Sequence, residues 1–219
     1  MIHGEADLGS LGFDVDRKGK AVTGEERWKS HRATVSSFWD MIAEYFRGMD
    51  VEGLKIYQDG LLAGGELGIN IAEKVAASGS KNFSLVLELV ERGATLMKTE
   101  SEEFLIKEYQ RTLDLARADS LAKKSLALVK YRMGKRDLTK KRDAFIALTI
   151  DGTLEEGETG TLLLGAYHKV EPRLSRDIEV VNLKDRGKLL EYMKEVAVGR
   201  DEGRLRELAE YLASPVTVS

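Results

Sequence analysis

Cysteine is absent from this chain of 219 residues, and only two prolines occur in it. The absence of cysteine excludes disulfides, thiolate zinc sites and cysteine nucleophiles, so a metal ion would depend on His, Asp, Glu or water. It also makes a cytoplasmic protein the default expectation. The scarcity of proline, combined with 32% charged residues, is typical of long and well-solvated helices.

An excess of charge of one sign is missing as well. Lys and Arg number 34 against 37 Asp and Glu, and this balance creates no field that would hold nucleic acid or an anionic membrane. The longest apolar runs, such as residues 161–166, are far shorter than the roughly 20 residues that a bilayer requires. No basic stretch followed by an apolar one occurs near the N-terminus. We therefore expect no nucleic-acid partner, no signal peptide and no membrane span.

Apolar residues recur at helical spacing over much of the chain. The spacing predicts helices over residues 28–47, 66–77, 80–96, 102–133, 139–154, 188–198 and 204–212. Trp28 and Trp39 are expected to pack inside the protein, and His31 is expected at the surface. Residues 1–24 are polar and rich in glycine without a sustained period, which predicts a very short strand followed by a long loop.

Short apolar runs between these helices predict strands. One run ends at Asp59, a second, glycine-bounded run over residues 160–168 ends at His168, and a third covers residues 177–183. The predicted fold class is α/β, with a small, mostly parallel sheet flanked by many helices in a helix-rich, three-layer arrangement. We expect one domain over residues 1–219, with a helical insertion around 80–140 and a C-terminal helical pair over 188–212.

Polar side chains follow the predicted strands. His3, with Glu5 and Asp7 after it, follows the first strand, while Asp59 and His168 follow two others. Because ligands bind beyond the carboxyl ends of parallel strands, these side chains are expected to face one cleft. His3, Asp7 and His168 could hold Zn²⁺, Mn²⁺ or Fe²⁺, or a histidine and a carboxylate could act without metal as general acid and base. The alternative is that both histidines end strands and bind neighbouring backbone.

The pair Arg142-Asp143 is predicted in the first turn of a helix, before the last apolar strand. Arg142 could reach the cleft and bind a substrate carboxylate or phosphate in a bidentate manner. An ordinary ion pair at a solvated helix start is the alternative, and the residues alone favour it. The glycines at 60, 64, 65 and 68 match neither the dinucleotide fingerprint nor the P-loop, so they predict a tight connection between strand and helix.

These motifs resemble those of the superfamily that includes TraB, PrgY and TIKI proteins, ChaN haem-binding proteins and erythromycin esterases. Its pattern is a first strand ending in His, a later strand ending in an acidic residue, an Arg-Asn or Arg-Asp pair, and a strand ending in Gly-Ala-x-His. The matching residues are His3, Asp59, Arg142-Asp143 and Gly165-Ala166-Tyr167-His168. Only two residues precede His3, and Asp59 stands where Glu is commoner.

The resemblance implies an α/β fold with a cleft, hydrolysis in some members and ligand binding in others. The first hypothesis is a hydrolase of small molecules or peptides, with or without a divalent metal, in which Arg142 steadies an oxyanion and the other catalytic residues are His3, Glu5, Asp59 and His168. The second is a non-catalytic binding protein for a small ligand or haem, with Tyr167 or His168 as axial ligand. The third is an interaction module whose C-terminal helices dock a partner or a second copy of the chain.

Overall fold

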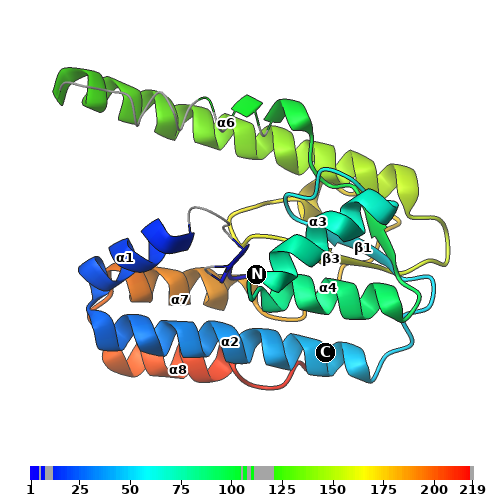
Figure 1. Ribbon diagram of the computed structural model, residues 1–219, viewed down its shortest axis with the longest axis horizontal. Helices are drawn as coiled ribbons and strands as arrows, with labels where there is room; N and C mark the ends of the chain where they lie inside the picture. The colour runs from blue at the N-terminus through cyan, green and yellow to red at the C-terminus, as the bar shows by residue number, and fades with distance from the viewer. Residues whose placement is uncertain (5, 8–11, 105, 108–109, 111–120, 218–219) are drawn as a thin grey trace.

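A small parallel sheet lies at the centre of the protein. The computed structural model describes residues 1–4, 6–7, 12–104, 106–107, 110 and 121–217 (Figure 1). The sheet has the order β2-β1-β3 and consists of β1 (Lys55–Gln58), β2 (Thr95–Met97) and β3 (Gly160–Leu163). The helices are α1 (Gly12–Thr23), α2 (Glu25–Arg47), α3 (Gly65–Ala77), α4 (Lys81–Glu91), α6 (Leu121–Thr153), α7 (Arg186–Val198), α8 (Glu202–Leu212) and the 3-10 helix η2 (Glu171–Arg173). The predicted helix-rich α/β class is confirmed.

Helices cover both faces of the sheet because successive strand residues point to opposite sides. Ile56, Leu96 and Leu163 belong to the larger apolar core, which contains residues of α2, α3, α4, α7 and α8. Tyr57 belongs to a smaller core with Ile146 and other residues of α6. Figure 1 shows α6 crossing above the sheet, opposite the layer formed by α2 and α8. The three-layer arrangement therefore follows from apolar side chains on both faces of each strand.

The N-terminal residues lie against the continuation of β3. The Met1 ammonium donates to the Leu164 carbonyl, and the Ala166 N–H donates to the Met1 carbonyl at 3.3 Å. The Trp39 indole N–H also donates to the Ile2 carbonyl at 3.1 Å. Because β1 pairs in parallel with both β2 and β3, the carboxyl ends of all three strands meet at one edge of the sheet, and Met1 leads into that edge.

The prediction of a long loop over residues 1–24 is wrong, since α1 occupies half of it. Tertiary packing explains this helix better than its sequence does. A Cβ on Gly19 would fall 2.5 Å from the Trp28 ring, so glycine lets α1 lie directly on α2. The Trp28 indole N–H also donates to Asp16 at 2.8 Å. This contact cannot be read from the apolar periodicity of α1 itself.

One helix prediction and one strand prediction need correction. The helix predicted over 80–96 ends at Glu91, because Gly93 turns the chain with φ +99°, and β2 follows it. The strand predicted over 177–183 is wrong. Its Val180 and Val181 are 40% and 51% exposed, and its described residues form no backbone ladder with β3.

The helix that carries Arg142 and Asp143 is much longer than predicted. It begins at Leu121 rather than near residue 139, so the pair lies in the body of α6 and not in its first turn. The part of the predicted 102–133 helix at 105, 108–109 and 111–120 lies outside the described residues. His31 is also not a surface residue, because its ring packs between Trp28 and Tyr192. No helix in the described ranges is long and apolar enough to cross a membrane.

Candidate functional site

Asp59 lies at the centre of the polar groups at the carboxyl edge of the sheet. Its backbone N–H donates to the Leu163 carbonyl at 2.9 Å, which continues the pairing of β1 with β3. Its side chain is 7% exposed and accepts two hydrogen bonds, from the Gly165 N–H to Oδ2 at 3.1 Å and from Arg142 Nη2 to Oδ1 at 3.0 Å. The carboxylate is therefore held between β3 and α6.

Two imidazoles face the same oxygen of Asp59. His168 Nε2 lies 3.6 Å and His3 Nε2 lies 3.9 Å from Asp59 Oδ2. Both separations are longer than a direct hydrogen bond, and a water molecule placed to one side of the three atoms would be within hydrogen-bonding reach of each. The carboxyl edge of the sheet thus brings together His3, Asp59 and His168, which we call the His-Asp cluster.

Gly165 makes this close approach feasible. A Cβ at this position would fall 3.1 Å from both Asp59 Oδ2 and His3 Nε2, and 3.5 Å from His168 Cδ2. A side chain at residue 165 would therefore push Asp59 and His3 away from it by a few tenths of an ångström, while it would only touch His168. The glycine in the Gly-Ala-x-His motif accordingly has a steric role here.

A second carboxylate supports each histidine. Asp143 Oδ1 lies 2.6 Å from His168 Nδ1, and Asp143 Oδ2 accepts the Lys169 N–H at 3.0 Å. On the other side, Asp7 Oδ2 lies 4.0 Å from His3 Nδ1 and accepts the Gly4 N–H at 2.7 Å. The hydroxyl of Ser80, the N-cap residue of α4, donates to the other oxygen of Asp7. The buried Asp143 fixes the His168 ring more tightly than Asp7 fixes His3.

Glu100 completes the site and was missed by the sequence analysis. Arg142 Nη2 lies 2.6 Å from Glu100 Oε2, and the carboxylate is 1% exposed. Burial raises the pKa of Glu100, and the Arg142 guanidinium partly offsets this shift. Glu100 follows β2, most of which was predicted as the end of the 80–96 helix. Its position after a strand could therefore not be recognised from the sequence. Arg142 thus binds two carboxylates of the protein itself, which differs from its predicted role of binding substrate.

The two histidines differ in their access to solvent. The side chain of His3 is 36% exposed, whereas that of His168 is 9% exposed. Partial burial lowers the pKa of His3 below 6.5, against the opposing effect of Asp59 and then of Asp7. Burial thus favours the uncharged form of the His3 imidazole. Burial also lowers the pKa of the Met1 ammonium to about 6.

The residues predicted as metal ligands do not form one ligand set. Asp7 approaches His3 at Nδ1, while Asp59 and His168 lie on the Nε2 side of that ring. An ion held by Nε2 would thus be on the wrong side of the ring for Asp7. Within the described ranges, no group of three His, Asp or Glu side chains is arranged to hold a metal ion. Glu5 lies outside the described residues.

Tyr167, predicted as a cofactor ligand, is largely exposed to solvent. Its side chain is 68% exposed, although it precedes His168 directly. His168 Nδ1 is taken by Asp143, whereas its Nε2 faces Asp59 at 3.6 Å. The axial-ligand role of either residue stays a prediction.

Comparison of the chain with protein-family models, with curated proteins and with solved structures finds no match in any of the three. Membership of the TraB- and ChaN-containing superfamily therefore stays a prediction from short motifs. The function has to be argued from the geometry of the cluster.

Replacement of Gly165 by Ala is expected to destabilise the protein by about 1–3 kcal/mol, because the added methyl group overpacks the His-Asp cluster. The matched control is Gly152→Ala in α6, where no atom lies within 4 Å of the new Cβ. That change is expected to stabilise by up to about 1 kcal/mol, since alanine favours helix. Urea unfolding of both variants measures the difference. Equal stability of the two variants would contradict the steric role of Gly165.

Proposed function

We propose that the protein is a hydrolase that uses His168 as general base without a metal ion. The observation that carries this proposal is the 2.6 Å contact between His168 Nδ1 and the buried Asp143 carboxylate. Such a carboxylate holds an imidazole in one tautomer and stabilises its protonated form, while the opposite nitrogen remains for proton transfer. In His168 that nitrogen, Nε2, points toward Asp59 and His3.

The geometry supports activation of a water molecule within the cluster. A water that bridges the gaps of 3.6 and 3.9 Å would contact both imidazoles and Asp59. His168 Nε2 takes a proton as the water oxygen attacks an acyl carbon, and the resulting imidazolium is stabilised by Asp143 and Asp59. The same proton then passes to the leaving oxygen or nitrogen as its bond to carbon breaks. Water is added across the bond, and His168 returns to its neutral state.

Arg142 supports this chemistry indirectly. Its guanidinium pairs with both Asp59 and Glu100 and offsets one of the two negative charges that they place beside the cluster. The salt bridge also holds the Asp59 carboxylate in place, with its other oxygen facing Nε2 of His168. Arg142 is therefore a positioning residue in the proposal.

The proposal is tested by hydrolysis of p-nitrophenyl esters, short peptides and phosphoesters by the wild-type protein and by His168→Gln. The variant is expected to lose at least about 10²-fold of any activity found. The control is Tyr167→Phe, which changes only the exposed neighbour and is expected to be fully active. Activity should also survive treatment with EDTA.

Circular dichroism and urea unfolding establish that His168→Gln is folded before its activity is compared. Unchanged activity in a folded His168→Gln would contradict the role of the histidine. Loss of wild-type activity on chelation would contradict metal-free catalysis, and the absence of hydrolysis of all three substrate classes would contradict the reaction class.

A further inference from the structure

Three aromatic side chains pack together where α1, α2 and α7 meet (Figure 1). The ring of His31 lies 4.9 Å from that of Trp28 and 5.7 Å from that of Tyr192, measured between ring centroids. His31 Nδ1 also lies 3.0 Å from the Tyr192 hydroxyl. Trp28 is 8% and Tyr192 is 1% exposed, so the imidazole packs against two buried rings. We call these three residues the aromatic cluster.

The docking of α1 depends on this cluster. Gly19 of α1 lies against the Trp28 ring, and the Trp28 indole N–H donates to Asp16 of α1 at 2.8 Å. Helix α1 otherwise buries little, because none of its side chains that the structure describes is buried, and its Phe13 is 77% exposed. A helix with so few buried contacts opens more easily than the rest of a protein. A change that disturbs the aromatic cluster is therefore expected to release α1 first.

The charged side chains on the surrounding helices interact with one another rather than with His31. They form the pairs Asp16 with Lys20 and Arg32, Arg27 with Glu202, and Glu191 with Arg204, while Lys188 lies over the Tyr211 ring and Glu195 lies against Gly199. No carboxylate of the described residues forms an ion pair with His31. A proton on His31 would therefore create a partly buried charge without a counter-charge, which is unfavourable. Burial accordingly lowers the pKa of His31 to about 4.

We propose that His31 makes the docking of α1 on α2 and α7 sensitive to acid: the neutral imidazole keeps the aromatic cluster closed, and the protonated imidazole opens it and releases α1. A charged ring is more stable in water, and water reaches it fully only when a neighbouring helix separates from α2. Helix α1 is the one that separates, because α7 buries Leu189 and Val196 as well as Tyr192. The faces of the Trp28 and Tyr192 rings attract a cation and oppose this opening, but they return less than the loss of water costs.

The pH range of the opening follows from the pKa of His31 in the two states. In the open state the imidazole has its ordinary pKa of 6.5, and in the closed state its pKa is about 4. The open state therefore binds the proton more readily. The contribution of His31 to docking is complete above pH 6.5 and decreases as the pH falls toward 4. At pH 5 the open fraction of α1 should exceed that at pH 7.5 by more than about tenfold.

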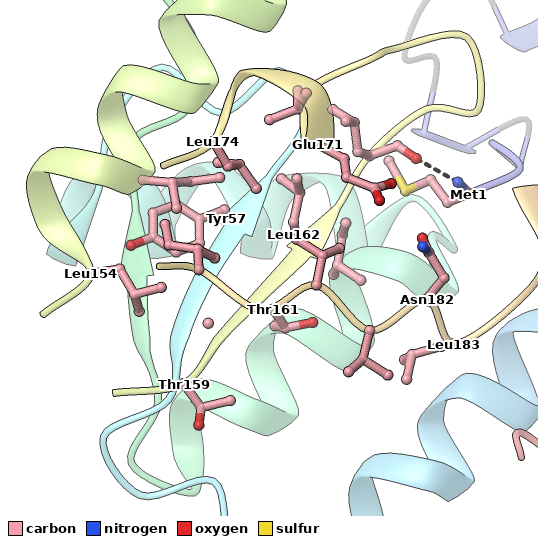
Figure 2. Close-up of a pocket in the computed structure, with 18 of the residues that line it drawn as sticks. Met1, Tyr57, Leu154, Thr159, Thr161, Leu162, Glu171, Leu174, Asn182 and Leu183 are labelled. Atoms are coloured by element: carbon pink, nitrogen blue, oxygen red, sulfur yellow. Dashed lines mark hydrogen bonds between the residues drawn. The ribbon is translucent and has the colours of Figure 1, made fainter. Parts of the chain in front are cut away.

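The aromatic cluster is separate from the proposed active site. Figure 2 shows the cavity beside β3, which is lined by Leu162 and also by His168 of the His-Asp cluster. None of the three residues of the aromatic cluster lines this cavity. The acid response is therefore independent of the proposed hydrolase activity, and it is measured without any substrate.

The first test is an NMR titration of the His31 ring in the full wild-type chain. Its pKa is expected near 4, because burial opposes protonation and no carboxylate favours it. A pKa below 6 supports the proposal. A pKa of 6 or higher would mean that the attraction of the two rings outweighs burial, and the proposal would be overturned.

The second test is amide hydrogen exchange of the wild-type protein at pH 5 and pH 7.5, corrected for the intrinsic effect of pH on exchange. The amides of α1 are expected to lose protection by more than about tenfold at pH 5. The amides of the buried Leu85 and Leu89 in α4 report on unfolding of the whole chain and should lose less. Equal losses in α1 and α4, or no loss in α1, would overturn the proposal.

The variant His31→Phe assigns the response to one side chain. It removes the titrating group and keeps an aromatic ring in the cluster. Its α1 amides are expected to respond to pH no more than its α4 amides do. If α1 of the variant opens at pH 5 as in the wild type, another titrating group is responsible and the proposal is overturned. The two wild-type tests decide the proposal if the variant does not fold.

Discussion

Replacement of Asp143 by Asn is expected to lower kcat of the proposed hydrolase by about 10²–10⁴-fold. The amide keeps the shape of the carboxylate, and its oxygen can still accept the Lys169 N–H. It supplies no charge to stabilise the His168 imidazolium, and its NH₂ group favours the wrong tautomer of the ring. The effect should appear in kcat rather than in KM, because Asp143 is buried and its carboxylate bonds to His168 and to the Lys169 N–H.

The matched control for this prediction is Asp151→Asn on the same helix. Asp151 Oδ1 also accepts a backbone N–H, that of Ser175 at 3.1 Å, but it is exposed and is not in contact with a histidine. Its substitution should leave kcat unchanged. Should both variants lose activity equally, the loss would reflect the packing of α6 rather than the state of His168.

The sequence predicted much of this fold because strong apolar patterns dominate it. The periodicity over 28–47 corresponds to α2, and the glycine-bounded run at 160 corresponds to β3. The failures occur where contacts between distant residues decide the structure. Residues 12–23 form α1 because Gly19 fits against Trp28, and residues 177–183 lack the ladder that a strand requires. The periodicity of apolar residues along a segment reports neither its packing against distant residues nor its pairing with another strand.

The site was predicted through one topological rule and was limited by one missed strand. Asp59 and His168 follow parallel strands whose carboxyl ends meet, as predicted, whereas His3 follows no strand and reaches the same edge through the hydrogen bonds of Met1 with Leu164 and Ala166. The same rule would have added Glu100, had Thr95–Met97 been recognised as a strand after Gly93. The role of Arg142 could not be inferred either, because its partner was the unrecognised Glu100.

Replacement of Arg142 by Met is expected to destabilise the protein by about 3–5 kcal/mol at pH 7–8, because it leaves two carboxylates buried without their counter-charge. Glu100 is 1% exposed and the side chain of Asp59 is 7% exposed. The matched control is Lys141→Met, the exposed neighbour on α6, which should change stability by less than about 0.5 kcal/mol. Urea unfolding of both variants and of the wild type provides the measurement.

The pH dependence of this loss identifies its cause. Burial already raises the pKa of Glu100 above its ordinary value of 4.5, and removal of Arg142 removes the effect that opposes this. When the pKa is higher in the folded state, protonation stabilises that state, fully below pH 4.5 and decreasingly as pH rises through the folded pKa. The difference in unfolding free energy between Arg142→Met and wild type should therefore be smaller at pH 5 than at pH 8.

Adding Glu100→Gln to the variant should recover part of the lost stability at pH 8. A gap independent of pH and unaffected by Glu100→Gln would mean that Arg142 contributes by packing alone, and the proposed neutralisation of Asp59 and Glu100 would have to be abandoned.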